Sequence, residues 1–145
     1  MSKVTADSDC PLCVAAGGAL VWQNALCRVV AVDDADYPGF VRVILNRHQS
    51  EMTDLQAAER DALMAVVWAV ESVLRESLQP DKINLASLGN VVPHLHWHVI
   101  PRWRDDRHFP NPIWGEPMRK AAARPVDAAA LAAALSGRLD RLTAQ

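Results

Sequence analysis

The stretch Gly89-Asn90-Val91-Val92-Pro93-His94-Leu95-His96-Trp97-His98-Val99-Ile100-Pro101-Arg102 carries three of the chain's five histidines, at alternate positions. Successive side chains of a β-strand point to opposite faces, whereas a helix would scatter the three imidazoles around its axis. A strand therefore places the histidines on one face, about 6.5–7 Å apart along the chain. The prolines near both ends suit the termini of a strand.

Three imidazoles on one strand face allow three interpretations. One is a polar surface without chemistry, which the strict alternation disfavours. Another is a zinc site with an open coordination position, because imidazole is a common zinc ligand. The third is nucleophilic catalysis, in which a neutral imidazole attacks phosphorus and its neighbours donate hydrogen bonds to phosphate oxygens.

The segment His94-Leu95-His96-Trp97-His98-Val99-Ile100 resembles the signature of the histidine triad (HIT) family, in which histidines alternate with apolar residues. The resemblance extends from about Cys10 to Trp114. It implies an α+β, HIT-like fold: a mainly antiparallel sheet of about five strands, one long helix and a C-terminal helix. HIT proteins are nucleotide-binding dimers that hydrolyse or transfer nucleoside monophosphate groups through a covalent nucleotidyl-histidine.

The resemblance implies a role for each histidine of the triad. His96 is the expected nucleophile at the α-phosphorus, and His98 is expected to bind phosphate oxygens and assist the leaving group. His94 is expected to orient the site, directly or as a zinc ligand. The predicted enzyme is a HIT-type hydrolase or transferase acting on a phosphoric anhydride or phosphoramidate bond. The alternatives are a nucleotide-binding regulatory protein with little turnover and a metallohydrolase with catalytic zinc on the triad.

The resemblance also implies a phosphate contact just before the triad, at Asn90. Gly89 permits a positive φ or a close backbone approach, and the amide of Asn90 can donate to a phosphate oxygen. Phosphoramidase relatives commonly carry a Ser or Thr hydroxyl at the next position, where this chain has Val91. That difference argues against efficient P–N cleavage.

Ribose and base contacts are also implied by the resemblance. An acidic or amide residue at the end of a strand holds the ribose hydroxyls in this family, and Asp33 or Asp34 occupies that place. Carboxylate oxygens suit the task because they accept two hydrogen bonds. Val32 and Ile44 are candidate walls of a pocket for a purine base, with plain core packing as the alternative.

Cys10-Pro11-Leu12-Cys13 is a C-x-x-C pair, and Cys27 is a third cysteine. A disulfide is disfavoured in a cytoplasmic protein, and a thioredoxin-type redox pair is expected after a strand, which residues 1–9 do not predict. Half of a tetrahedral zinc site suits the pair, with two unligated thiols as the alternative. The branch of HIT proteins that this chain resembles completes the site with two histidines, which implies structural zinc on Cys10, Cys13, His48 and His94.

Apolar patterns predict the remaining elements of one HIT domain over residues 1–145, with its core at about 10–115. Strands are predicted at Leu20–Trp22, Leu26–Val32, Phe40–Leu45 and Ile83–Leu88. Thr53 and Gln56 have the spacing of a capping box that opens an amphipathic helix of roughly 25 residues. Leucines spaced among alanines predict a C-terminal helical extension at about 126–143.

Composition limits the partners of this chain. Its net charge of −2 does not support a broad electrostatic surface for nucleic acid. No apolar run approaches the roughly 20 residues of a membrane span, and Met1–Asp7 lacks the apolar core of a signal peptide. We therefore expect a cytoplasmic protein with no membrane or nucleic-acid partner and no organic cofactor.

A homodimer is expected from the family resemblance and from strand edges that need a partner. Trp68 lies off the apolar stripe of the long helix and is a candidate contact with a second subunit. Trp103 and Trp114 are expected to pack across the dimer. The alternative places them, with the neighbouring arginines, beside a distal phosphate or second base of the substrate.

Overall fold

The structure is a computed structural model and describes residues 6–143. Its elements in chain order are α1 (Pro11–Val14), β1 (Ala19–Gln23), β2 (Cys27–Ala31), β3 (Val41–Leu45), a 3-10 turn (Met52–Asp54), α2 (Ala57–Leu78), β4 (Lys82–Ala86), β5 (His96–Arg102) and α3 (Ala128–Thr143). The strands form one sheet in the order β1-β2-β3-β5-β4, and every neighbouring pair is antiparallel. This confirms the α+β fold with a five-stranded antiparallel sheet.

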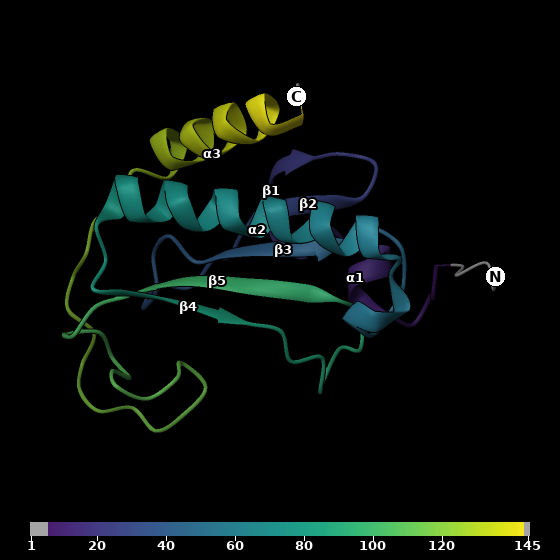
Figure 1. Ribbon diagram of the computed structural model, residues 1–145. Coiled ribbons are helices and arrows are strands. Elements are labelled where there is room, and N and C mark those ends of the chain that lie inside the picture. Colours follow the sequence, from purple (N-terminus) through teal and green to yellow (C-terminus); the bar gives the residue numbers. More distant parts are fainter. Residues whose placement is uncertain (1–5, 144–145) are drawn as a thin grey trace.

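The main core lies between the sheet and α2, which runs along one face of it (Figure 1). Val43 of β3 and Val99 of β5 are fully buried on this face. They pack in one cluster with Leu63, Val70 and Leu74, which recur on α2 at helical spacing. Side chains alternate along a strand, so the residues on either side of Val43 in β3 and of Val99 in β5 point to the opposite face of the sheet.

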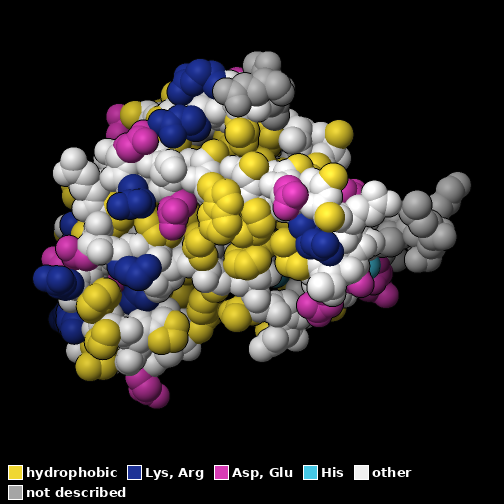
Figure 2. All heavy atoms as spheres, in the orientation of Figure 1, with side chains coloured by type: hydrophobic (Ala, Val, Ile, Leu, Met, Phe, Trp, Pro, Cys, Tyr) yellow, Lys and Arg dark blue, Asp and Glu magenta, His cyan; other side chains and the backbone are white. Residues whose placement is uncertain are grey.

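The opposite face carries two of the triad histidines. Across β3 and β5, Ile44 pairs with His96 and Arg42 pairs with His98. Directly paired residues share a face, so all four side chains lie on the side of the sheet away from α2. Figure 2 shows the α2 side of the molecule, where hydrophobic side chains gather near the centre and hardly any histidine is visible.

α2 begins later than the capping-box pattern predicts. Its N-cap is Gln56, whose capping box is completed by Glu59, and the helix has 22 residues and ends at Leu78. Thr53 lies inside the preceding 3-10 turn Met52–Asp54, so its prediction as the N-cap is wrong. That turn has a capping box of its own, which uses the acidic side chains on either side of Thr53.

α3 packs against α2 and lies beside β1 (Figure 1). Leu131, Leu135 and Leu139 are buried and belong to the same core cluster as α2. Trp22 of β1 donates through Nε1 to Asp140 at 3.0 Å. The C-terminal helix thus shares the core formed by α2 and the sheet. Within residues 6–143, no helix combines the length and the apolar character that a membrane crossing requires.

Candidate active site

His96 is the buried histidine at the start of β5, and its ring orientation is set by the main chain. Its Nδ1 lies 2.6 Å from the carbonyl oxygen of His94. A carbonyl oxygen only accepts hydrogen bonds, so Nδ1 is the protonated nitrogen of the neutral ring. Ser87 donates through its hydroxyl to the carbonyl oxygen of His96 at 2.8 Å. In that neutral ring the Nδ1 contact with His94 leaves the lone pair on Nε2, as a nucleophile requires.

His98 lies two residues further along β5 and is held by an arginine. Arg42 donates through Nε to Nδ1 of His98 at 3.4 Å, so the neutral His98 ring carries its proton on Nε2. The rings of Phe40 and Trp114 pack edge-on against it, with centroids 5.6 and 4.9 Å away. Burial, with the nearby His96 and Arg42, lowers the pKa of His98 to about 4. His98 is thus a neutral hydrogen-bond donor at pH 7.

His94 lies two residues before β5, which begins at His96, so the predicted strand that begins at His94 is too long. His94 is fully buried. Its N–H donates to the carbonyl of Val92 in a local turn, at 2.8 Å, and not to a neighbouring strand. Its Nε2 lies 2.6 Å from the carbonyl oxygen of Leu45, which places the ring proton there. Nδ1 is left unprotonated and points to two cysteine sulfurs, Cys10 and Cys13, each 3.4 Å away.

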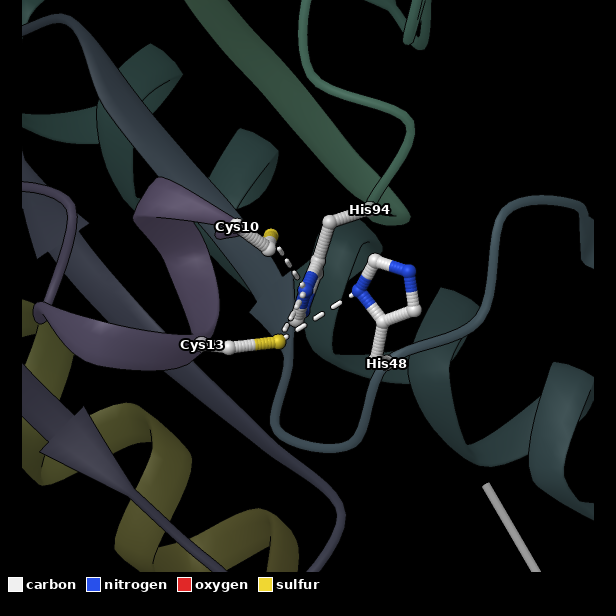
Figure 3. A group of neighbouring side chains, drawn as sticks. All are labelled: Cys10, Cys13, His48 and His94. Atoms are coloured by element: carbon white, nitrogen blue, oxygen red, sulfur yellow. Dashed lines mark hydrogen bonds between the residues drawn. The ribbon is translucent and has the colours of Figure 1, made fainter. Parts of the chain in front are cut away.

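The group Cys10, Cys13, His48 and His94 can hold a metal ion, because its ligand atoms all lie within 4.8 Å of one another. Figure 3 shows the two sulfurs and the two rings turned toward a common point. His48 Nδ1 lies 3.4 Å from the sulfur of Cys13. Tetrahedral zinc, with bonds of about 2.3 Å to sulfur and 2.0 Å to nitrogen, separates its ligand atoms by about 3.5 Å. The donor set and its spacing fit such an ion.

Arg28 of β2 holds the C-x-x-C segment in place, a role that the sequence analysis missed. Its guanidinium donates to the carbonyl oxygens of Leu12, Ala15 and Ala16 at 2.6, 3.1 and 2.9 Å. These carbonyls lie at the end of α1, where helical partners are lacking. A charged residue within an apolar strand could have indicated a functional or structural role for Arg28, and the same holds for Arg42.

The predicted phosphate contacts lie in the loop between β4 and β5. Gly89 has φ +73°, in the left-handed region that glycine adopts without strain. Asn90 is exposed, and Val91 is 93% exposed. An open hollow beside this loop is lined by Ser87, Gly89 and His96. The loop thus lies next to His96 and is accessible to a ligand.

The predicted ribose and base contacts are spread more widely. Asp33 is exposed, and Asp34 accepts the N–H of Asp36 at 3.0 Å. Within residues 6–143, neither Asp33 nor Asp34 hydrogen-bonds a triad histidine; both line an apolar groove beside α3. Val32 is half-buried, next to the cluster that contains Phe40. Ile44 is fully buried in a cluster with residues of α1, so it lies beneath the surface of the site.

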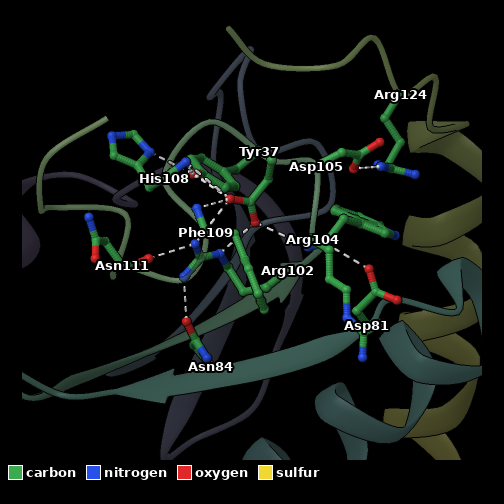
Figure 4. A network of polar contacts seen from close by, with 12 residues as sticks. Tyr37, Asp81, Asn84, Arg102, Arg104, Asp105, His108, Phe109, Asn111 and Arg124 are labelled. Atoms are coloured by element: carbon green, nitrogen blue, oxygen red, sulfur yellow. Dashed lines mark hydrogen bonds and ion pairs between the residues drawn. The ribbon is translucent and has the colours of Figure 1, made fainter. Parts of the chain in front are cut away.

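The segment that follows β5 is anchored by a buried ion pair. Arg102 donates through Nε to Asp106 at 2.7 Å, and both side chains are almost fully buried. Arg102 also donates to the side-chain oxygen of Asn84 and the carbonyl of Asn111, each at 2.7 Å (Figure 4). Burial would raise the pKa of Asp106, but hydrogen bonds from Arg102 and backbone N–H groups outweigh it and lower that pKa to about 2.

Two further contacts extend this network to the loop after β2. Tyr37 Oη lies 2.6 Å from Nδ1 of His108 and donates to Asp106 at 3.3 Å. The network ties down the loop that brings Trp114, half exposed, against His98. Trp103, in contrast, is buried within its own chain under the guanidinium of Arg124, 4.1 Å from the ring centroid. The prediction that Trp103 packs across a dimer is therefore wrong.

A family model described as the HIT domain matches residues 16–105, more than half of the chain. The chain belongs to the HIT family. This HIT chain is 33% identical over 84 residues to an AP-4-A phosphorylase of Mycobacterium tuberculosis, a match covering 54% of the chain and 43% of that relative. It is 32% identical over 74 residues to a bis(5'-nucleosyl)-tetraphosphatase (asymmetrical) of Schizosaccharomyces pombe, covering 48% and 41%. The HIT chain thus matches less than half the length of these relatives.

Among solved structures, the HIT chain resembles a histidine triad protein from Bradyrhizobium japonicum. The two are 31% identical, with a TM-score of 0.70, over 83% of this chain and 89% of the other. The sheet order and the placement of the helices are therefore those of a HIT fold.

Proposed function

We propose that this HIT chain is a nucleotide hydrolase or transferase that cleaves at the α-phosphate of a nucleoside monophosphate conjugate or dinucleoside polyphosphate. The observation that carries the proposal is the 2.6 Å contact between His96 Nδ1 and the His94 carbonyl oxygen. In the neutral ring this contact places the lone pair on Nε2, the atom that would attack phosphorus. Family membership and the names of the two relatives, a phosphorylase and a tetraphosphatase, support a nucleotide substrate.

The proposed reaction has two displacements at phosphorus. His96 Nε2 forms a bond to the α-phosphorus, the bond to the leaving group breaks, and its electron pair departs with that group. His98 donates from Nε2–H to the departing group, while Asn90 and the backbone at Gly89 offset the developing charge. Water or a second phosphate then displaces the nucleotide from His96. Asp33 or Asp34 is the proposed ribose contact, and a purine is the proposed base.

We propose that the metal of the Cys10, Cys13, His48 and His94 group is structural zinc. Four protein ligands complete a tetrahedral zinc, so bound zinc would tie the C-x-x-C segment to the start of β5 without taking part in the reaction. Within residues 6–143, the group that can hold a metal includes His94 but neither His96 nor His98. This division of the triad argues against zinc as the catalytic centre.

A cytoplasmic homodimer without a nucleic-acid partner remains our proposal for the state of the protein. Within residues 6–143, β1 and β4 are the outermost strands of the sheet and each leaves one edge without a strand partner. These edges and the half-exposed Trp68 on α2 support a second subunit.

Product analysis with diadenosine tetraphosphate, with and without inorganic phosphate, tests the proposed function. A hydrolase releases AMP and ATP, whereas a phosphorylase passes the AMP group to phosphate and forms ADP. His96→Asn should lower kcat by about 10³-fold or more while nucleotide binding persists, because the nucleophile is lost. Nucleotide binding by the unmodified protein without any product would instead favour the regulatory alternative.

A further inference from the structure

Arg42 is the charged residue in a strand whose other members are all buried and apolar. It lies directly across from His98, so its side chain is on the face that carries His96 and His98. The reaction proposed above gives Arg42 no role, although Arg42 contacts His98, which does have a role in it.

The contacts of Arg42 use only part of its hydrogen-bonding capacity. Nε–H donates to Nδ1 of His98 at 3.4 Å, and Nη1 donates to the carbonyl oxygen of Gly17 at 3.2 Å. The guanidinium carbon lies 5.6 Å from the centroid of the Phe40 ring. A guanidinium has five N–H groups and cannot accept, so His98 must accept through Nδ1 and donate through Nε2.

The charge of Arg42 has no carboxylate partner among residues 6–143. Two other arginines on this face have their own partners: Arg28 donates to the carbonyl oxygens of Leu12, Ala15 and Ala16, and Arg102 pairs with Asp106. Burial lowers the pKa of Arg42, which reflects the cost of a partly desolvated cation, and an anion bound nearby would offset that cost. His98 is neutral at pH 7, so Arg42 supplies the positive charge beside it.

We propose that Arg42 is a specificity-determining residue that presents His98 as an Nε2–H donor and favours a phosphate over an amine as the leaving group. The inference rests on the proposed function and narrows it to phosphoric anhydrides. When a P–O bond of an anhydride breaks, the electron pair stays on the departing phosphate oxygen, which leaves as an anion without taking a proton. A nearby guanidinium and an N–H donor stabilise that anion.

A phosphoramidate makes the opposite demand on the same site. The departing amine nitrogen needs a proton as the P–N bond breaks. Burial lowers the pKa of His98 to about 4, so at pH 7 the ring is neutral and has no imidazolium proton to give to the departing nitrogen. The positive charge of Arg42 also disfavours a protonated amine beside it. Val91, on the adjoining loop, has no hydroxyl to relay a proton. These features together favour the anhydride.

The test compares kcat/KM for diadenosine tetraphosphate and for an adenosine 5'-phosphoramidate of an alkylamine. Arg42→Leu should lower kcat/KM for the tetraphosphate about 100-fold, the usual effect of losing one charge-stabilising donor. The phosphoramidate should change less than about threefold, so the ratio of the two values falls. Arg42→Lys keeps the charge and should retain much of the preference. Arg138→Leu, at a partly exposed position of α3 that pairs with Glu76 of α2, makes the same change in net charge and should leave the ratio unaltered.

Nitrogen NMR of His98 provides a readout that a purely structural role would not change. The unmodified protein should show Nε2 of His98 protonated and Nδ1 unprotonated. Arg42→Gln, which removes the charge but keeps a long polar side chain, should give a mixture of the two tautomers. If the Arg42 variants keep both the ratio of the two kcat/KM values and the His98 tautomer, this inference is wrong, while the proposed function still stands. Unmodified protein that cleaves neither substrate would overturn the proposed function, and this inference with it.

Discussion

The carbonyl oxygen of His94 accepts a hydrogen bond from Nδ1 of His96, over 2.6 Å, while the ring of His94 belongs to the group that can hold a metal. One residue thus joins the candidate metal site to the candidate nucleophile. The ring of His94 is in turn oriented by the carbonyl of Leu45, as a metal-bound histidine commonly is. We infer that metal binding and the orientation of His96 are linked.

Removal of the metal should therefore weaken both the fold and the reaction. Chelation, or Cys13→Ser, should lower the melting temperature and reduce kcat about 10- to 100-fold, although the metal touches no substrate. Metal content, thermal unfolding and kcat measured on the same samples check this. Cys27→Ala removes a buried thiol outside the group and should keep a full equivalent of metal. Full activity after complete metal removal would contradict the link.

The ion pair between Arg102 and Asp106 should contribute strongly to stability. Asp106→Asn leaves a buried guanidinium without its carboxylate, so the free energy of unfolding should fall by about 3 kcal/mol or more. The neighbouring variant Asp105→Asn breaks an exposed ion pair with Arg124 and should lower the free energy of unfolding by less than about 1 kcal/mol. Chemical denaturation of both variants measures the two changes in the free energy of unfolding. Equal changes would show that the buried ion pair stabilises the fold no more than the exposed one.

The buried His98 should make the protein less stable in acid. Its pKa is about 4 in the folded state and 6.5 in its unperturbed form, so the unfolded chain binds its proton first as pH falls. The stability contribution is full above pH 6.5 and is lost as pH falls through 4, by about 3 kcal/mol. In His98→Gln the decline in unfolding free energy between pH 6.5 and 4 should be shallower by that amount. Parallel curves for the two proteins would refute the prediction.

A hydroxyl at position 91 should improve P–N cleavage. Val91 is 93% exposed, so Val91→Ser should fold normally and place a proton donor beside the leaving group. We expect kcat/KM for an adenosine 5'-phosphoramidate to rise about tenfold or more and that for diadenosine tetraphosphate to stay constant. Val91→Ala is the matched control, and an equal response of the Ser and Ala variants would rule out the hydroxyl as the cause.

The strands, the shared face of His96 and His98 and the long helix were predictable, because strand and helix periods are local properties of the sequence. The position of His94 was not predictable from this period. Its N–H bonds to Val92 within a turn, and its ring turns toward cysteines more than 80 residues earlier in the chain. The family resemblance, not the strand pattern, indicated that these residues meet.

The network behind Trp114 was also beyond local patterns. Tyr37 and His108 are 71 residues apart, and the acidic, glycine-containing segment around Tyr37 is typical of a solvated loop. Arg42 was visible as one charge in an apolar strand, but its role depends on which residue lies across the sheet from it. The register of distant strands follows from the whole fold, so the pairing of Arg42 with His98 required the structure.

Covalent nucleotidyl transfer to His96 is the central claim, and the mass of the intact protein tests it most directly. Protein mixed with excess diadenosine tetraphosphate is quenched rapidly without acid and compared with His96→Gly. The account predicts an added mass of one adenosine monophosphate group on the unmodified protein and none on the variant. The same adduct on His96→Gly, or neither adduct nor AMP from the unmodified protein, would contradict it.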